Sequence, residues 1–288
     1  PGGQKKECLR MNKILEKARA IEQEIIADRR CLHQMPEVGV YTPRTAAYIK
    51  ERLTEMGIAH RDCGVHSQED REKMVFAGYP HAPTSTGVVA VIGKGGPCIL
   101  LRADMDALRV REATGLDFQS ENGAMHACGH DMHAAMLLGA AALLKRHQAD
   151  LKGTVLVFQP DEEGFTGAKS ILEAGVLKDA PTPQAALALH VNSGTPSGMV
   201  LCGRGTFMAG CTLFRITVRG KGCHGAMPET GVDPIGIAAQ IWLALQEITG
   251  RELPAKTPAV VTVGRFQAGQ APNIIPDEAV LEGTVRTF

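Results

Sequence analysis

Nine residues of this chain, from Met125 to His133, contain one thiol, three imidazoles and one carboxylate. Histidine and cysteine are strong side-chain ligands for first-row metals, and such a density is hard to explain by packing alone. Cys128 and His130 are two residues apart, so an extended backbone would direct both side chains to the same side. The segment therefore predicts a metal site.

Three further segments carry metal-capable side chains directly after a strand-like apolar run. The runs and the residues that follow them are 98–101 with Asp104 and Asp106, 153–158 with Glu162 and Glu163, and 185–189 with His190. In open α/β sheets, ligands bind beyond the carboxyl ends of the strands. Convergence of four distant segments is thus the main argument for a site.

A mixed set of cysteine, histidine and carboxylate suits zinc, or manganese or cobalt where two ions share bridging oxygens about 3.5–4 Å apart. Two adjacent glutamates allow one to bind metal while the other takes a proton from metal-bound water, whose pKa falls to about 7 on zinc. The expected reaction is hydrolysis of an amide or similar carbonyl bond. A second hypothesis makes Cys128 a nucleophile, with His130 or His190 as its base.

Periodicity and turn residues predict the elements that must position these side chains. Helices are expected at 13–30, 43–56, 132–146 and 167–174, and strands at 87–93, 98–101, 153–158 and 185–189. Asp131 is a plausible cap for the helix that begins near residue 132. The alternation of strands and helices predicts an α/β sheet covered on both faces.

Glycine and proline crowd the chain after Asn192, which predicts a domain boundary. Residues 11–193 are expected to form a metal-binding catalytic domain and residues 194–288 a smaller α+β sandwich. The elements expected in the second domain are strands at 212–219, 259–266 and 279–287 and a helix at 234–250. A chain of 288 residues is also longer than a typical single domain.

Composition excludes several classes of partner. Lysine plus arginine and aspartate plus glutamate both total 31, so no electrostatic footprint for nucleic acid or a polybasic membrane site is present. No apolar run is long enough to span a bilayer, and the N-terminus lacks the apolar core of a secretory signal. The eight cysteines show no paired short spacings, which favours buried thiols in a reducing cytoplasm.

Four motifs, in order, resemble the metal-dependent amidohydrolases that include aminoacylases, hippurate hydrolase and indole-acetyl-amino-acid hydrolases. They are RADMDAL at 102–108, HACGHD at 126–131, QPDEEG at 159–164 and ALH at 188–190. The resemblance implies two divalent ions (Zn, Mn or Co) held by Cys128, His130, Glu163 and His190. It also implies that Glu162 is the general base and that Asp104 and Asp106 support the site.

The same resemblance implies a mixed, mostly parallel sheet of zinc-exopeptidase type with flanking helices, and a second domain that dimerises. The histidine matched by His224 would reach a partner's active site and polarise the scissile carbonyl. Asn273 and Arg286 match groups that hold the carboxylate side of an N-acyl amino acid or peptide, a task that suits the two-pronged arginine. The expected assembly is a homodimer.

The family's last metal ligand is a histidine in a C-terminal segment, and this chain stops before it at Phe288. A fragment lacking that segment is therefore expected, and a third hypothesis is a non-catalytic chain that keeps the fold and part of the metal binding. Metal analysis separates this hypothesis from the hydrolase.

Several of these residues also have purely structural interpretations. Asp104 and Asp106 would cap a helix beginning near Ala107. His126 would support the loop, and His133 would lie on the helix surface. Asn273 would be a turn residue, and Arg286 a surface charge on a strand. No site role is expected for the remaining histidines considered, which are His33, His60, His66, His81 and His147.

Overall fold

The computed structural model describes residues 12–65, 85–93, 95–178, 180 and 182–288. His66 and His81 therefore lie outside the described residues. The chain divides into two compact units between Thr195 and Pro196, and each unit is described by itself.

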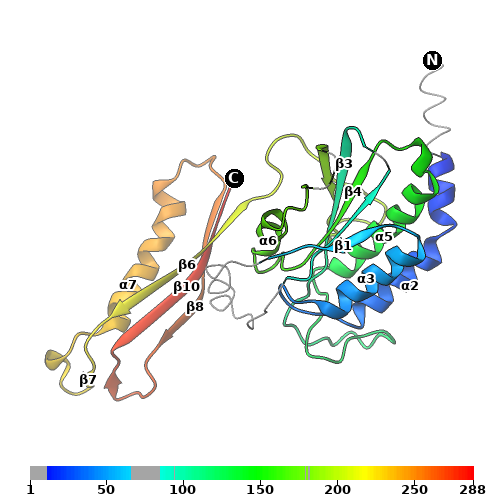
Figure 1. The fold of residues 1–288 in the computed structure, drawn as a ribbon. Helices are drawn as coiled ribbons and strands as arrows, with labels where there is room; N and C mark the ends of the chain where they lie inside the picture. The colour runs from blue at the N-terminus through cyan, green and yellow to red at the C-terminus, as the bar shows by residue number, and fades with distance from the viewer. Residues whose placement is uncertain (1–11, 66–84, 94, 179, 181) are drawn as a thin grey trace. The chain divides into compact units, whose positions relative to one another are not determined.

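The first unit is built on a five-stranded sheet in the order β1-β2-β4-β3-β5 (Figure 1). Its elements are α2 (Glu22–His33), α3 (Pro43–Glu55), β1 (His60–Asp62), β2 (Val88–Ile92), β3 (Cys98–Asp104), α5 (His130–Arg146), a 3₁₀ turn (Gln148–Asp150), β4 (Thr154–Gln159), α6 (Gly167–Glu173) and β5 (Pro183–Ala188). β1 with β2 and β2 with β4 are antiparallel. β4 with β3 and β3 with β5 are parallel. The sheet is mixed, as predicted, but parallel pairing accounts for two of these four pairs rather than for most of them.

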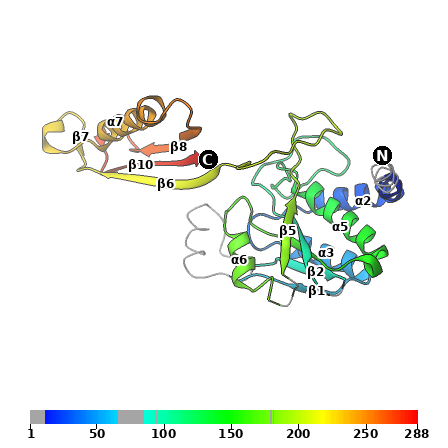
Figure 2. The same ribbon diagram turned by 90° about the horizontal axis from the view of Figure 1, so that it is seen from above.

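The central strand β4 is buried along its whole length because helices cover both faces of the sheet. Leu156 and Phe158 pack into the core formed with α2, α3 and α5. Val155 and Val157 point to the other face and pack with Ile171 of α6. Both views show α6 opposite α5 and α2 (Figures 1 and 2). The alternation follows from the two-residue period of a strand, and the predicted double cover is confirmed.

The prediction of one helix over 13–30 is wrong. Residues 12–19 are helical, the chain turns at Ala20 and Ile21, and α2 then begins at Glu22. Ile21 is 2% exposed, so the turn buries its side chain, while the apolar periodicity continues across the break. Neither glycine nor proline marks the turn, which is why the sequence pattern did not reveal it.

The second unit has a three-stranded antiparallel sheet in the order β6-β10-β8 and a separate two-stranded pair, β7 with β9. Its elements are β6 (Gly210–Arg219), β7 (Cys223–His224), a 3₁₀ turn (Pro228–Thr230), α7 (Pro234–Glu247), a π-helical turn (Ile248–Glu252), β8 (Ala259–Ala268), β9 (Ile274–Ile275) and β10 (Glu278–Thr287). Asp233 caps α7 by accepting a hydrogen bond from the Ile235 N–H at 2.8 Å. Ala238 of α7 packs on the sheet against Leu281.

In the part of the chain that the structure describes, no helix of either unit combines the length and the apolarity that crossing a bilayer requires.

Candidate metal centre

The candidate site lies where three strands of the first unit end. β3, β4 and β5 run parallel to one another, so their carboxyl ends lie at one edge of the sheet. Asp104 ends β3, Glu162 and Glu163 follow β4, and His190 follows β5, while His130 begins α5. The structure therefore brings all four segments together around His130.

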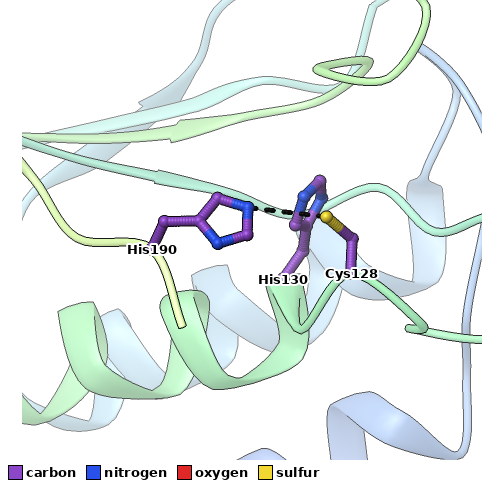
Figure 3. Close-up of side chains that lie close together, drawn as sticks. All are labelled: Cys128, His130 and His190. Carbon is purple, nitrogen blue, oxygen red and sulfur yellow. Dashed lines mark hydrogen bonds between the residues drawn. The ribbon is translucent and has the colours of Figure 1, made fainter. Parts of the chain in front are cut away.

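Cys128, His130 and His190 lie close together at this cluster (Figure 3). The Cys128 Sγ lies 3.4 Å from the His190 Nε2. One ligand atom from each of these residues lies within 4.8 Å of the other two, which is close enough for a shared metal ion. Cys128, His130 and His190 thus form a set that can coordinate a cation.

A second set of possible ligands shares the same imidazole. The His130 Nε2 lies 3.9 Å from a carboxylate oxygen of Glu162 and 3.9 Å from one of Glu163. His130 therefore stands between a thiol–imidazole set and a two-carboxylate set, an arrangement that suits two neighbouring cations.

Gly129 gives the loop its shape. Its φ is +86°, in the left-handed region, and a Cβ added there would lie 2.3 Å from the Val191 Cγ2. The two-residue spacing suggested an extended backbone between Cys128 and His130. That expectation is wrong, because Gly129 adopts the left-handed conformation. The two side chains meet because the chain turns at Gly129 and enters α5 at His130.

Asp106 organises three parts of the cluster at once. Its carboxylate accepts hydrogen bonds from the backbone N–H of Glu162 at 3.0 Å and of Glu163 at 3.2 Å. Its Oδ1 also lies 3.3 Å from the His130 Nδ1. Asp106 therefore fixes the turn that carries Glu162 and Glu163. The other ring nitrogen of His130, Nε2, faces these two glutamates.

The interpretation of Asp104 and Asp106 as caps of a helix near Ala107 is wrong. Residues 105–108 are not helical. The Ala107 N–H donates to the Glu37 carbonyl at 2.8 Å, and Leu108 pairs with Met125. These long-range bonds hold the chain extended, so the carboxylates remain available to the site.

Asp104 holds a different imidazole. Its Oδ1 lies 2.5 Å from the His133 Nδ1, and its Oδ2 accepts from Arg102 at 2.8 Å. Although burial alone would raise it, these two partners hold the pKa of Asp104 at about 2. His133 is 3% exposed, so its expected place on the helix surface is wrong. Because α5 begins at His130, the spacing of three residues puts both rings on one helix face.

The turn that presents the two glutamates is strained. Asp161 has a φ of +51°, which costs a non-glycine residue about 1–2 kcal/mol. Its buried carboxylate accepts a hydrogen bond from the Thr166 hydroxyl, and a Cβ at Gly164 would lie 2.2 Å from its Oδ1. Burial raises the pKa of Asp161 to about 6 against the effect of Thr166. Gly164 is required because Asp161 occupies the space of a side chain there.

The charges around His130 fit a cation. Burial by itself lowers the pKa of His130, but Asp106, Cys128 and Asp104 raise it to about 11, so positive charge is strongly favoured here. The buried Nε2 has no hydrogen-bond partner among the described residues. A nitrogen left unpaired amid carboxylates, a thiol and a second imidazole is the donor set expected for a divalent metal.

The two glutamates differ in their neighbours. The hydrogen bond with His130 by itself lowers the pKa of the Cys128 thiol, but burial and Glu163 raise it above its usual value. Burial and the charge of Glu163 raise the pKa of Glu162. The side chain of Glu162 is 36% exposed and that of Glu163 23%. Glu163 is thus associated with the thiol, and Glu162 is the more open of the two.

Asp131 does not cap α5, contrary to prediction. It lies inside the first turn, after the start of α5 at His130. Its carboxylate lies 2.8 Å from the His33 Nδ1 and 2.8 Å from the Arg29 Nε. The other nitrogen of His33 lies 3.0 Å from Glu112. Asp131 links α5 to α2 through this buried network. The side chain of Asp131 is therefore bonded to α2 and does not cap α5.

His126 is buried beside this network, with its ring centroid 6.4 Å from that of His33. Both of its ring nitrogens lack hydrogen-bond partners among the described residues, and burial lowers its pKa to about 4. His60 contacts the Ile58 carbonyl and His147 contacts Lys17. In the described part of the chain, none of these three histidines belongs to a ligand set.

The second unit brings two of its three predicted site residues together. His224 of β7 pairs with Ile274 of β9, and the Gly225 N–H donates to the Asn273 carbonyl at 2.8 Å, so His224 and Asn273 are neighbours. Asp277 contacts Gly222 just before the start of β10. Arg286 lies nine residues later, near the far end of β10, which is about 30 Å along the strand from Asp277. Asn273 and Arg286 are therefore not brought together within this unit.

An α/β sheet that gathers a thiol, imidazoles and carboxylates beyond its strand ends defines a metal-binding α/β protein. The profile of Peptidase family M20/M25/M40 matches residues 100–282, which include this cluster. With this match and the relatives that follow, the chain belongs to that peptidase family. The resemblance inferred from the four motifs is thereby confirmed at the level of the family.

Two curated relatives show the extent of the similarity. The chain is 41% identical over 267 residues to the IAA-amino acid hydrolase ILR1-like 4 of Arabidopsis thaliana, covering 92% of this chain and 56% of the relative. It is 42% identical over 272 residues to the N-acetyl-L-cysteine deacetylase of Bacillus subtilis, covering 93% of this chain and 60% of the relative. The chain thus spans rather more than half the length of these relatives.

A solved structure supports the fold. The Bacillus subtilis YXEP protein, described as a dinuclear metal binding peptidase from the M20 family, is 37% identical and superposes with a TM-score of 0.68. The alignment covers 94% of this chain and 65% of that protein. The α/β fold with a mixed sheet and flanking helices is therefore that of a solved member of the family.

Proposed function

We propose that this protein hydrolyses the amide bond of N-acyl amino acids or small peptides with the help of two divalent cations (Zn²⁺, Mn²⁺ or Co²⁺). The observation that carries the proposal is the gathering of Cys128, His130, Glu162, Glu163 and His190 at one sheet edge. The relatives named above, a hydrolase of IAA-amino acids and a deacetylase, support the same reaction class.

Cys128, His130, Glu163 and His190 are the residues that would hold the cations. Bound divalent cations supply Lewis acidity, which polarises a carbonyl oxygen and makes an attacking water more acidic. The close approach of Cys128 and His190 and the unpartnered Nε2 of His130 among the described residues are the features of this chain that fit them.

Glu162 is the proposed general base. Its carboxylate lies at the cluster, 3.9 Å from the His130 Nε2, and its backbone is fixed by Asp106. It takes a proton from the attacking water as the water oxygen forms a bond to the carbonyl carbon. It then gives that proton to the amine nitrogen as the carbon–nitrogen bond breaks, so the carboxylate is regenerated.

His224 is the proposed donor to the scissile carbonyl oxygen. Its Nδ1 accepts a hydrogen bond from the Ala226 N–H at 3.1 Å, which leaves the proton on the exposed Nε2. Asn273 and Arg286 are proposed to bind the carboxylate side of the substrate. About 30 Å of strand separates Arg286 from Asp277, which is only four residues after Asn273, so we expect a small substrate to contact both Asn273 and Arg286 only when two copies contribute. This separation supports a homodimer.

A mixing experiment tests the shared site. His224→Ala and Glu162→Gln proteins should each be nearly inactive, since each lacks one group in every site. A heterodimer of the two has one site with both groups intact, so random mixing should recover roughly a quarter of wild-type turnover. Mixed dimers confirmed by mass that recover no turnover would contradict a site shared between copies.

Metal removal tests the proposed function as a whole. Treatment with a strong chelator should abolish hydrolysis of N-acyl amino acids, and addition of Zn²⁺, Mn²⁺ or Co²⁺ to the stripped protein should restore it. Full activity after the metal content has fallen to zero would favour the thiol mechanism at Cys128. Binding of fewer than about one ion per chain, together with no turnover on any acyl amino acid or peptide, would favour the non-catalytic hypothesis.

A reducing cytoplasm is the proposed location. No disulfide joins the cysteines that lie in the described ranges, which fits such a compartment. Secretion into an oxidising compartment, detected by cell fractionation, would contradict it.

A further inference from the structure

We propose that His133 is a positioning residue, which holds the metal-facing imidazole of His190 in place through the peptide group of Val191. The inference rests on the proposed function only in taking His190 as a ligand. The hydrogen bonds on which the inference rests join residues of this chain and do not involve a metal ion.

The first link joins His133 to the sheet. The Nδ1 of its buried ring lies 2.5 Å from the Asp104 Oδ1, and Asp104 is anchored in turn by Arg102 at 2.8 Å. Both Asp104 and His133 are almost fully buried, at 1% and 3% exposure. A charge-assisted hydrogen bond shielded from water in this way is strong and fixes the orientation of the ring.

The second link joins His133 to the segment after β5. The Val191 N–H donates to the His133 Nε2 at 2.9 Å. Because a backbone N–H is always the donor, this Nε2 must be unprotonated, and the ring proton of neutral His133 must be on Nδ1, facing Asp104. Both nitrogens of His133 are therefore occupied.

The position of the ring proton on Nδ1 distinguishes two possible roles of His133. By distance alone, Asp104, His130 and His133 form a set that could hold a metal ion. A ligating nitrogen must offer its lone pair to the ion, and the only lone pair of His133 already accepts from Val191. His133 is thus a support for the site rather than a ligand within it.

The third link joins Val191 to the ring of His190. The His190 Nδ1 lies 2.6 Å from the Val191 carbonyl oxygen, and the opposite nitrogen, Nε2, faces the Cys128 thiol at 3.4 Å (Figure 3). A metal-binding histidine commonly donates its second nitrogen to a backbone carbonyl, which fixes the tautomer and the ring. Val191 is therefore held by His133 on its N–H and orients His190 with its C=O.

His190 needs this support because it is exposed. An exposed side chain retains its rotamer freedom unless specific contacts remove it, and a ligand must be ordered before it can bind metal tightly. The path from Arg102 through Asp104, His133 and Val191 supplies that order from the end of β3.

Three variants separate the role of His133 from general stability. His133→Phe keeps a ring of similar size and removes both hydrogen bonds, whereas His133→Gln retains an acceptor that reaches the position of Nε2. His126→Phe is the matched control. His126 is also a buried histidine near the start of α5, yet its nitrogens have no hydrogen-bond partner among the described residues.

The metal-free protein gives the first readout, by ¹⁵N NMR. His133 should show the Nδ1–H tautomer, and the Val191 amide should exchange slowly with solvent. His133→Phe should speed this exchange by about 10-fold or more, equal to the loss of a hydrogen bond of about 1.4 kcal/mol. His133→Gln and His126→Phe should keep it slow. An Nε2–H tautomer, or a Val191 amide that stays protected in His133→Phe, would overturn the proposal.

The second readout is the affinity for Co²⁺, measured by competition with a chelator. His133→Phe should bind Co²⁺ about 10–100-fold more weakly than wild type, with most of the affinity restored in His133→Gln and none lost in His126→Phe. Wild-type affinity in His133→Phe would overturn the positioning role. If wild type itself binds no Co²⁺ while Val191 protection still depends on His133, the proposed metal function fails and the hydrogen-bonded support stands.

Discussion

Glu162→Gln should lower kcat by about 10²–10⁴-fold, the usual contribution of a general base, while leaving the metal content unchanged. Glutamine has the shape of glutamate but cannot take a proton at the pH of the reaction. Because Asp106 holds residue 162 through its backbone N–H, the substitution should not disturb the turn. Steady-state kinetics on an N-acyl amino acid, combined with metal analysis of the same sample, provides the measurement.

Glu163→Gln is the matched control, since it makes the same chemical change one residue away. Asp106 holds residue 163 in the same manner, at 3.2 Å, but Glu163 is the proposed metal ligand. Its substitution should release metal, whereas Glu162→Gln should retain it. A metal-loaded Glu162→Gln protein with near wild-type turnover would exclude Glu162 as the base.

Cys128→Ala should weaken metal binding by about 100-fold or more, beyond the 10–100-fold cost of losing an indirect support, and turnover should fall with the metal content. The sulfur lies 3.4 Å from the His190 Nε2, so its removal takes one ligand atom away from the metal site. Chelator competition with the purified variant measures the loss. Cys31→Ala, which changes a half-buried thiol of α2 outside every ligand set of the described residues, is the control.

Alkylation adds an independent test of the same thiol. If Cys128 binds metal, iodoacetamide should modify it slowly in the loaded protein and rapidly after chelation, because the coordinated thiolate is not available as a nucleophile. Equal rates in both states, with activity lost in step with alkylation, would instead support the thiol mechanism.

The strands and the place of the site could be predicted because their signals are local. The apolar runs that form β2, β3 and β4 are bounded by glycine, proline or polar residues, and metal-capable residues stand at or just after the ends of β3, β4 and β5. The pairing order could not be read in this way. β1 has only three residues, His60–Asp62, and its pairing with β2 has no hydrophobic signature.

The supporting residues were harder to predict because their partners are distant in sequence. Asp106 accepts from N–H groups 56 and 57 residues away, and no local pattern reports such a bond. His133 left a usable signal, since its spacing from His130 is that of neighbours on one helix face. That signal was missed because the helix was expected to begin at residue 132 rather than at His130.

A crystal structure of the zinc-loaded protein, with anomalous scattering measured at the zinc edge, would show whether Cys128, His130 and His190 share a metal ion. We expect zinc within about 2.0–2.3 Å of the Cys128 Sγ, the His130 Nε2 and the His190 Nε2, with a Glu163 oxygen in the same cluster and His133 bonded to Asp104 and Val191. Zinc bound elsewhere, or no anomalous peak between residues 128 and 190, would contradict this expectation.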